Sequence, residues 1–448
     1  MAEVTVGVDI GTTSVKAVAV DGDGTVVERA RIAHEIRMPA PDRLEHDADA
    51  AWHDGVRAAY EEVAAPHRVA GVQVAAMVPS MCAVDAEGHA LTPGLLYGDV
   101  RGRSGEGEAG SGTPDPSSPG GGEFQQFAKW CAAEAPPGAR LWPAQAMANH
   151  ALGGVAVIDP IVGLLAMPMF DGAGWDAAAC ESIGVDPNQL PRVVPASEPV
   201  GRVGDALLGA GTVDVYAEQL CAGALAEGDV FAIFGATLIV WLATPEAVAV
   251  PGLWTVPSLT PGLHLVGGAS NAGGLFIDWA RRLSGAVALA PTSQSTDPAR
   301  VPVWLPYVRG ERTPLHDPDL RATLADLDLT HGPPELHRAA HEASAFVLRR
   351  HVELGGRPAR RVVATGGGTR DIGWMQAVAD VTGLPVDTVA VPEGAALGAA
   401  FLGRVVAGLE TSDADAVRWA RPGKRYEPRD AWSAATEERY ARFCALTD

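Results

Sequence analysis

Cysteine is scarce in this sequence and follows no pattern that forms a structural site. The 448 residues include five cysteines, and no two of them are spaced as Cys-x-x-Cys. They stand at Cys82, Cys131, Cys180, Cys221 and Cys444. An odd number of scattered cysteines indicates neither a disulfide framework nor a cysteine-based zinc site. We therefore expect reduced thiols and a cytoplasmic location.

Positive charge is also in short supply, with 34 Lys and Arg against 55 Asp and Glu, a formal net charge of −21. Nucleic acids and anionic membrane surfaces would be repelled, so neither is expected as a partner. The longest apolar run, 230–244, is shorter than the roughly 18 residues of a membrane helix. A small-molecule substrate is the expected partner. A homodimer stays an open alternative, because the sequence does not fix the oligomeric state.

The composition is that of an ordinary globular protein, with 47% hydrophobic and 20% charged residues. A chain of this length is too long for one compact core. Proline and glycine interrupt the pattern between Pro191 and Gly211, which predicts domains over 1–206 and 207–427. Residues 428–448 are expected to form a C-terminal helix that packs back near the N-terminal domain. The Gly/Ser/Pro-rich segment 102–122 predicts a mobile surface loop.

A phosphate-binding hairpin is the most informative local feature. Apolar residues alternate from Val4 to Ile10, small residues follow at Gly11–Ser14, and a second strand is predicted over 15–21. Free amides and hydroxyls in such a turn can hold an anion, and Asp9 beside them can hold a hydrated Mg²⁺. An ordinary hairpin turn is the alternative interpretation.

Two further glycine turns and a small-residue helix follow. One turn is Phe234–Thr237, and the other is Thr365–Gly368, between a predicted strand at 362–364 and a predicted helix. The helix over 395–406 carries alanine and glycine on its inner face, which permits close approach of another backbone. Strand, glycine turn and helix in this order favour an α/β nucleotide site that is neither a P-loop nor a dinucleotide motif.

These turns occur with further motifs in a fixed order along the chain. They include Glu45-His46-Asp47 with Trp52, Asp99-Val100-Arg101, Gly267–Asn271 and the Gly-Glu-Arg-Thr-Pro run inside 305–314. From residue 4 to near Tyr440 the sequence resembles the FGGY family of carbohydrate kinases, within the actin, hexokinase and Hsp70 ATPase superfamily. The resemblance implies two actin-like (ribonuclease H-like) α/β domains that flank a deep cleft.

The same resemblance implies ATP-dependent, Mg²⁺-dependent phosphorylation of a sugar or polyol hydroxyl, of a xylulokinase-like kind. The residue that matches the family's catalytic base is Asp214, in the run Gly211–Glu218. A carboxylate in that place can take the hydroxyl proton as the phosphoryl group is transferred in line. Judged on its neighbours alone, an Asp after Gly-Thr would be a helix N-cap.

The resemblance also implies how the ligands are bound. Asp9, together with Asp214, is expected to hold the magnesium. The hairpin is expected to meet the transferred phosphoryl group, the second turn the other phosphates and the third turn the adenosine. The expected ATP contacts are Gly11, Thr12, Thr13, Gly235, Thr237, Gly366, Gly367 and Gly368.

Three departures from the family pattern bear on the substrate. The second phosphate loop reads Gly-Ala236-Thr237 in place of Gly-Thr-Ser, and Met77–Ser80 replaces the Gln-Met-His-Gly segment of xylulokinases. Val215 stands beside the base, where xylulokinases have Asn and glycerol kinases have Gln. Neither D-xylulose nor glycerol is therefore expected as the preferred substrate. The polar residues expected to take over are Ser80, Asp99, Arg101 and Glu218.

Alternatives remain for the site and for the whole chain. Asp99 and Arg101 could form only a surface salt bridge. The altered second loop and the missing sugar contacts keep open a catalytically weak or inactive member that binds sugar or nucleotide. An actin- or chaperone-like ATPase that moves a partner is disfavoured by the Gly-Glu-Arg-Thr-Pro run. Retention of Asp9 and Asp214 favours turnover.

Overall fold

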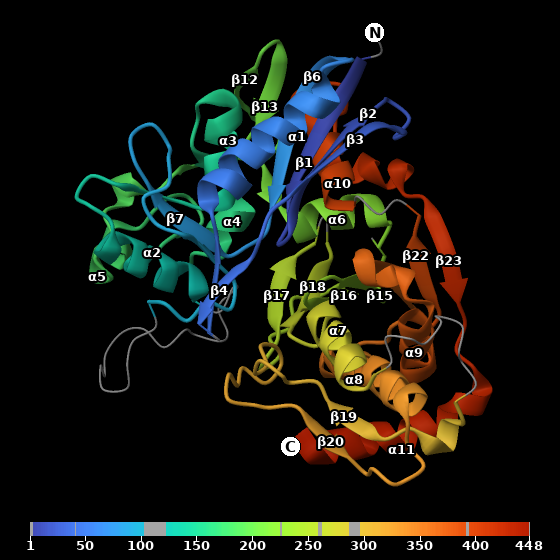
Figure 1. Cartoon of the computed structure of the whole chain (residues 1–448). Helices are drawn as coiled ribbons and strands as arrows, with labels where there is room; N and C mark the ends of the chain where they lie inside the picture. The colour runs from blue at the N-terminus through green and yellow to red at the C-terminus, as the bar shows by residue number, and fades with distance from the viewer. Residues whose placement is uncertain are drawn as a thin grey trace. The chain divides into compact units, whose positions relative to one another are not determined.

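The computed structural model describes residues 3–40, 42–102, 122–224, 226–258, 262–285, 296–390 and 394–447. Apart from its two end residues, the predicted loop 102–122 lies outside these ranges. The chain divides into two compact units, coloured along the sequence in Figure 1. The first unit contains Met1–Cys221 and Glu393–Trp419, and the second contains Ala222–Pro392 and Ala420–Asp448. Each unit is described by itself.

The first unit is built on one mixed sheet. A three-stranded antiparallel meander, β3-β2-β1, is extended by β6, which runs parallel to β1, and by β13, which runs parallel to β6. Strand β12 closes one edge, and the short β14 also pairs with β6. The strands are β1 (Glu3–Ile10), β2 (Ser14–Val20), β3 (Val26–Ala33), β6 (Arg68–Ala76), β12 (Pro199–Val203), β13 (Ala206–Gly209) and β14 (Thr212–Val213).

The sheet of the second unit repeats this arrangement. Its meander is β18-β16-β15, β21 runs parallel to β15, and β22 runs parallel to β21. Strands β17 and β23 lie at the two edges. The strands are β15 (Asp229–Phe234), β16 (Leu238–Thr244), β17 (Trp254–Pro257), β18 (His264–Ser270), β21 (Arg361–Thr365), β22 (Val386–Val389) and β23 (Pro422–Tyr426). The same strand order, 3-2-1-4-5, therefore occurs twice, which confirms the predicted pair of actin-like α/β domains.

The first unit also contains a smaller antiparallel sheet. Its strands run in the order β4-β5-β8-β7-β9, with β10 and β11 as a separate parallel pair. The strands are β4 (Arg37–Ala40), β5 (Arg43–His46), β7 (Ser80–Val84), β8 (Gly94–Leu96), β9 (Arg140–Trp142), β10 (Val157–Ile158) and β11 (Arg192–Val193). The helices of this unit are α1 (Gly55–Ala64), α2 (Glu123–Glu134), α3 (Ala144–Gly153), α4 (Pro160–Leu164), α5 (Ala177–Ser182), α6 (Asp214–Ala222) and α10 (Gly394–Val406).

Helix α10 lies directly on the first sheet although it comes late in the sequence, as its colour beside the blue strands in Figure 1 shows. The approach is so close that a Cβ added at Gly7 would lie 1.9 Å from the carbonyl oxygen of Ala396. A Cβ at Gly71 would similarly lie 2.1 Å from the carbonyl oxygen of Gly403. The predicted close packing of this small-residue helix is confirmed, and it uses glycines of the strands as well as of the helix.

The second unit is completed by α7 (Gly274–Leu283), α8 (Pro333–Leu354), α9 (Ile372–Thr382), α11 (Asp430–Thr447) and the strand pair β19 (Val303–Leu305) and β20 (Thr323–Ala325). Helix α11 buries Trp432, Tyr440 and Phe443 in the core of this unit. The predicted boundaries therefore need correction, because 207–221 and 394–419 belong to the first unit and α11 to the second. Helix α10 packs on β1 and β6 of the first sheet, and α11 packs on α9 and β19 of the second unit.

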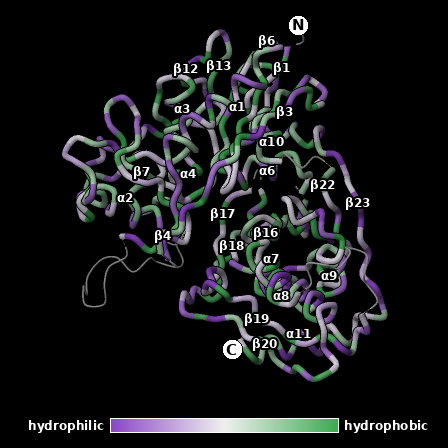
Figure 2. Tube along the Cα trace, viewed as in Figure 1, coloured by the Kyte–Doolittle hydropathy of each residue, from purple (hydrophilic) through white to green (hydrophobic). Residues whose placement is uncertain are grey.

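Strand β23 is an edge strand that carries polar residues. Figure 2 shows it as largely hydrophilic, and Lys424 and Arg425 in it are exposed. Charged side chains on a sheet edge discourage pairing with another chain. Among the helices that the structure describes, none has both the length and the apolar character needed to cross a membrane.

Candidate functional site

Two acidic residues meet at the carboxyl edge of the first sheet. The parallel strands β1, β6 and β14 are in register, with Ile10 opposite Ala76 and Val213 also opposite Ala76. Asp9 therefore ends one outer strand of this trio, and Asp214 follows directly after the other. These two strands lie two strand spacings apart, so their backbones are separated by about 10 Å. The carboxylate oxygens of the two side chains can lie closer together than the backbones do.

Asp9 is joined to a lysine across the hairpin. Lys16 is its cross-strand neighbour, and Lys16 Nζ donates to Asp9 Oδ2 at 2.9 Å. Asp9 is buried, while the lysine side chain is about one-third exposed. The negative charge of Asp9 raises the pKa of Lys16, against the effect of burial, so the lysine stays charged.

The carboxyl group of Asp214 is strongly perturbed. Burial raises its pKa to about 8, and the charges of Asp9 and Glu218 act in the same direction. Lys16 and the Val215 amide, which donates to Asp214 Oδ1 at 2.7 Å, oppose this shift. Asp214 is the first residue of α6, and this bond to the adjacent amide is not the N-cap geometry of the alternative interpretation.

The charge at this edge fits a divalent cation. Three carboxylates, those of Asp9, Asp214 and Glu218, interact with a single ammonium group from Lys16. Carboxylate oxygens are the ligands that Mg²⁺ prefers, and a bound cation would offset the surplus negative charge. The donor set of this chain is therefore compatible with the magnesium site implied by the resemblance.

Buried side chains that the sequence did not reveal hold the segment before Asp214 in place. Gln73 Oε1 accepts from the Gly211 amide at 3.0 Å, and Gln145 donates to the Ala210 carbonyl at 2.7 Å. Asp159 accepts from the Thr212 hydroxyl at 2.9 Å. These contacts fix the strand that leads into the proposed base. They come from scattered positions with no shared motif, so no sequence signal marks them.

The hairpin turn of the first unit is held through its carbonyl groups. Gly11 O accepts from His34 Nε2 at 3.0 Å, and Thr12 O accepts from His46 Nε2 at 2.9 Å. Thr13 O accepts from the His34 amide at 3.1 Å. None of these contacts uses the amide of Thr12 or Thr13. The turn is thus fixed from its carbonyl side, as an anion-binding turn requires.

His46 links the hairpin turn to the core, and this link predicts a pH effect on stability. Trp52 Nε1 donates to His46 Nδ1 at 3.1 Å, so a neutral ring must carry its proton on Nε2. Burial lowers the pKa of His46 to about 4. Because the unfolded ring gains a proton near pH 6.5, the stability contributed by His46 is present above that pH and is lost as the pH falls toward 4.

We expect the stability difference between the wild type and His46→Gln to shrink by about 1–3 kcal/mol between pH 7 and pH 4.5. Urea unfolding at the two pH values measures it. His89→Gln, at an exposed histidine, is the matched control and should show no such change. A pH-independent difference for His46→Gln would contradict the neutral, buried ring.

Asp99 and Arg101 form an interior ion pair. The Arg101 guanidinium donates to both Asp99 oxygens at 2.7–3.2 Å and also reaches Glu45 Oε2 at 2.8 Å. Asp99 is fully buried and accepts a further bond from the Leu44 amide at 2.7 Å. The pair thus joins two of the sequence motifs. The alternative of a surface salt bridge is therefore wrong, because the pair is buried. Both carboxylate oxygens of Asp99 already accept hydrogen bonds within the protein.

Ser80 has a structural position. Its side chain is buried, its hydroxyl donates to the Met77 carbonyl at 3.1 Å, and it accepts from the Ala144 amide at 3.2 Å. Its donor and one of its two acceptor sites are thus used within the protein, and its role as a substrate contact stays a prediction. Of the four residues predicted to replace the missing sugar contacts, Glu218 alone interacts with the Asp9 and Asp214 edge.

The second unit repeats the hairpin of the first. Gly235 donates its amide to the Thr237 carbonyl at 3.0 Å and closes the turn between β15 and β16. The amide of Gly274, at the start of α7, donates to the Gly235 carbonyl at 2.8 Å. Ile233 and Phe234 stand where the first hairpin has Asp9 and Ile10. The second hairpin pairs Phe234 with Leu238, where the first pairs Ile10 with Val15, so its turn is one residue tighter and it lacks the carboxylate.

The three glycines after β21 differ in how much space a side chain would have at each position. Gly366 has a φ of 85°, and a Cβ there would lie 2.8 Å from the Phe234 carbonyl oxygen. A Cβ at Gly368 would lie 2.5 Å from the Trp374 ring. A Cβ at Gly367 would meet nothing within 4 Å. The fold itself therefore needs the outer two glycines, while the middle one faces open space.

The Gly-Glu-Arg-Thr-Pro run forms buried hydrogen bonds in the second unit. Glu311 accepts from the Ser270 hydroxyl at 2.7 Å and from the Asn271 amide at 2.9 Å. Thr313 donates to the Ala269 carbonyl at 3.0 Å. Burial raises the pKa of Glu311 to about 7. These bonds attach the loop to the end of β18, so Glu311 and Thr313 have a structural role.

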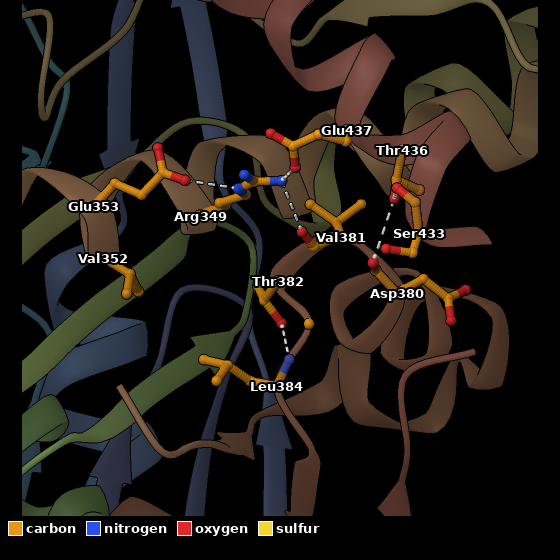
Figure 3. A pocket seen from close by; sticks show the side chains of 11 residues that line it. Arg349, Val352, Glu353, Asp380, Val381, Thr382, Leu384, Ser433, Thr436 and Glu437 are labelled. Carbon is orange, nitrogen blue, oxygen red and sulfur yellow. Dashed lines mark hydrogen bonds and ion pairs between the residues drawn. The ribbon is translucent and has the colours of Figure 1, made fainter. Parts of the chain in front are cut away.

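A pocket of about 210 Å³ lies in the second unit among residues of α8, α9 and α11 (Figure 3). Arg349 dominates it and forms ion pairs with Glu353 at 2.8 Å and Glu437 at 2.7 Å. None of the sequence-predicted site residues lines this pocket. Both ion-pair partners of Arg349 come from the pocket lining itself, so we do not take this pocket as the candidate site.

Comparison with known proteins gives concordant matches. Models of the N-terminal and C-terminal domains of the FGGY family of carbohydrate kinases match residues 4–105 and 230–407. The xylulose kinase of Escherichia coli is 31% identical over 266 residues, which cover 56% of this chain and 46% of that enzyme. The gluconokinase of Bacillus subtilis is 25% identical over 91% of this chain and 88% of its own.

A solved structure agrees with these sequence matches. The xylulose kinase from Rhodospirillum rubrum superimposes with a TM-score of 0.81 at 28% identity, over 99% of this chain and 98% of that one. The fold and the matches place the chain among phosphotransferases that use an alcohol group as acceptor. It belongs to the FGGY family of carbohydrate kinases.

Proposed function

We propose that this protein transfers the γ-phosphoryl group of ATP to a hydroxyl of a sugar or polyol, with Asp214 as the general base. The observation that carries the proposal is the carboxylate pair at the edge of the first sheet, where Asp214 interacts with Asp9 beside the hairpin turn. A cytoplasmic location is part of the proposal, and the five free thiols are consistent with it.

The proposed step is an in-line displacement. The acceptor oxygen forms a bond to the γ-phosphorus, the bond from that phosphorus to the ADP oxygen breaks, and the hydroxyl proton passes to Asp214 Oδ. A carboxylate whose pKa is raised toward neutrality is a stronger base than an ordinary aspartate. The amides of Thr12 and Thr13 would bind the transferred group, and Lys16 orients the Asp9 carboxylate.

Magnesium, held by Asp9 and Asp214, would supply charge compensation for the phosphates. In the second unit, Gly235 and Thr237 would contact phosphate oxygens, and Gly366–Gly368 would lie against the adenosine. The open space at Gly367 supports that assignment. Ala236 offers no hydroxyl, so the second loop would rely on backbone amides.

The acceptor is proposed only as a class. Relatives carry the names xylulose kinase, gluconokinase and glycerol kinase, which are kinases of polyhydroxylated compounds. Val215 beside the base cannot hydrogen-bond a hydroxyl, and Ser80 and Asp99 are committed internally. We assign Glu218, one helical turn from Asp214, as the polar residue that contacts the acceptor.

The test is an acceptor panel. The full chain is incubated with MgATP and a set of ketoses, aldoses, sugar acids and polyols, and ADP release is followed with the Asp214→Ala variant alongside. Release that one acceptor stimulates and the variant loses supports the proposal. ATP binding by calorimetry without turnover on any acceptor would favour a binding protein instead.

Gly367→Ala tests the adenosine-side assignment separately from turnover. Because a methyl group there meets no protein atom within 4 Å, the variant should fold as the wild type does. It should weaken binding of MgATP about tenfold or more, because the methyl group would crowd the nucleotide. Calorimetry measures the affinity, and thermal unfolding checks the fold.

The control for this prediction is Gly174→Ala, because that glycine likewise has open space and no positive φ. It should change neither nucleotide affinity nor stability. Unchanged MgATP affinity in Gly367→Ala would contradict the proposed position of the adenosine.

A further inference from the structure

Two histidines and an aspartate converge in the second unit, just beyond the glycine turn Gly366–Gly368. His337 and His341 are four residues apart on one face of α8, with ring centroids 4.3 Å apart. Asp371 faces them from the start of α9. One ligand atom from each of the three residues lies within 4.8 Å of the others.

The imidazole groups lack the hydrogen bonds that buried nitrogens normally make. His341 is only 2% exposed, and its Nε2 has no hydrogen-bond partner among the described residues. Nε2 of His337 is buried and unpartnered in the same sense. Polar atoms this deeply buried are nearly always satisfied. Their convergence on one carboxylate indicates a ligand that accepts electron pairs from all three.

The contact between His341 and Asp371 has the spacing of two ligands of one ion. His341 Nε2 lies 3.3 Å from Asp371 Oδ2, yet the pair does not meet hydrogen-bond geometry. Two donor atoms each about 2.0–2.1 Å from a tetrahedral ion are about 3.4 Å apart. His337 is half-buried, and one of its ring nitrogens lies within 4.8 Å of the ligand atoms of the other two residues.

The surroundings hold the ligands in place. Asp371 caps α9 by accepting from the Trp374 amide through Oδ1 at 3.0 Å, which leaves Oδ2 for the histidines. The Trp374 ring stacks on His341 with an interplanar angle of 6°. A Cβ at Gly373 would lie 3.1 Å from His341 Cε1, so a side chain there would crowd the imidazole.

We infer that His337, His341 and Asp371 bind one divalent transition-metal ion of the zinc class, with a fourth position open to water. Two imidazoles and one carboxylate suit Zn²⁺, whereas Mg²⁺ and Ca²⁺ prefer sites made of oxygen alone. The inference does not depend on the proposed function.

The position of the ion suggests what it would do for the fold. The Asp371 amide donates to the Gly368 carbonyl at 3.0 Å, so Asp371 is bonded directly to the last residue of the glycine turn Gly366–Gly368. An ion held by α8 and Asp371 would therefore tie that turn to the longest helix of the unit. The sequence signal that could have revealed the site is the His-x-x-x-His spacing on a predicted helix.

The test uses the full chain, stripped with a chelator and titrated with ZnCl₂ by calorimetry in the presence of excess MgCl₂. We expect one Zn²⁺ per chain, and visible absorption bands when Co²⁺ is bound instead. Asp371→Asn keeps the helix cap but loses the anionic ligand. This variant and His337→Ala should each bind Zn²⁺ at least about tenfold more weakly.

His89→Ala removes an exposed histidine of the first unit and should leave Zn²⁺ binding unchanged. Circular dichroism verifies that the variants fold, and the Co²⁺ spectrum of the wild type tests the site without any variant. Absence of Zn²⁺ binding and of Co²⁺ bands, or binding indifferent to both ligand variants, would overturn the inference. His341 would then be a core histidine packed on Trp374.

Discussion

Asp214→Asn is expected to lower the turnover number by about 10²- to 10⁴-fold, the range over which general base catalysis contributes. The amide has nearly the shape of the carboxylate but cannot take the acceptor's proton. MgATP affinity should fall much less than turnover, because the nucleotide contacts proposed for the second unit are untouched and Asp9 remains as a ligand for the magnesium. Steady-state kinetics with the best acceptor of the panel, together with calorimetry for MgATP, separate the two effects.

The same substitution should make the metal-free protein more stable. Because the pKa of Asp214 is raised from 3.8 to about 8, the folded protein holds a proton between those values that the unfolded chain has released. Stability contributed by this group therefore falls as the pH rises through that window. Asn has no such ionisation, so the variant should exceed the wild type most clearly above pH 8.

Asp54→Asn, at an exposed carboxylate, is the control and should affect neither turnover nor stability. Turnover of Asp214→Asn within about tenfold of the wild type would remove the case for this base. Equal stability of the variant and the wild type at pH 9 would instead contradict the perturbed pKa. The two measurements can fail independently, so they test the chemistry and the electrostatics separately.

Much of the architecture could be predicted from local patterns. Alternating valines, a turn of small residues and a second strand predict the first hairpin, and the alanine and glycine spacing predicts a closely packed helix over 395–406. The sheet to which a late segment returns has no local signal. Helix α10 packs on β1 and β6, which come far earlier in the chain, whereas α11 packs on α9 and β19 of its own unit.

The site could be predicted only in part. Asp9 and Asp214 stand in recognisable motifs, and the register of β1, β6 and β14 brings them to one edge. Ser80 and Asp99 show the limit, because in sequence a polar residue near a substrate and one buried in the framework look alike. Burial and hydrogen-bond partners, which depend on the whole fold, distinguish them.

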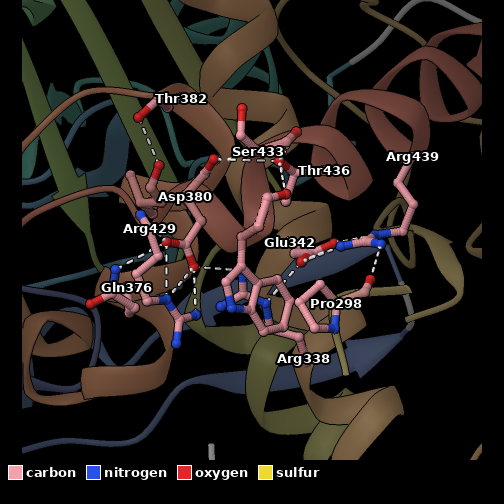
Figure 4. A network of polar contacts seen from close by, with 12 residues as sticks. Pro298, Arg338, Glu342, Gln376, Asp380, Thr382, Arg429, Ser433, Thr436 and Arg439 are labelled. Carbon is pink, nitrogen blue, oxygen red and sulfur yellow. Dashed lines mark hydrogen bonds and ion pairs between the residues drawn. The ribbon is translucent and has the colours of Figure 1, made fainter. Parts of the chain in front are cut away.

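Asp380→Ala is expected to lower the free energy of unfolding by about 3–5 kcal/mol, the usual cost of removing one partner of a buried ion pair. Asp380 is fully buried and accepts from Arg338 at 2.9 Å and from Arg429 at 2.6 Å (Figure 4). Arg338 also pairs with Glu342, which in turn pairs with Arg439. The network joins α8, α9 and α11, so removing Asp380 would weaken the contacts between all three helices.

The size of this effect depends on burial, which a second Asp→Ala substitution in the same unit can test. Asp278 pairs with Arg281 on α7 at 3.4 Å, with both side chains about half-exposed, and Asp278→Ala should change stability by less than about 0.5 kcal/mol. Urea unfolding followed by tryptophan fluorescence measures both variants. Arg338 would be left buried without the charge of Asp380, whereas Arg281 would simply be hydrated. Equal losses in the two variants would therefore mean that the buried network stabilises this unit no more than a surface pair does.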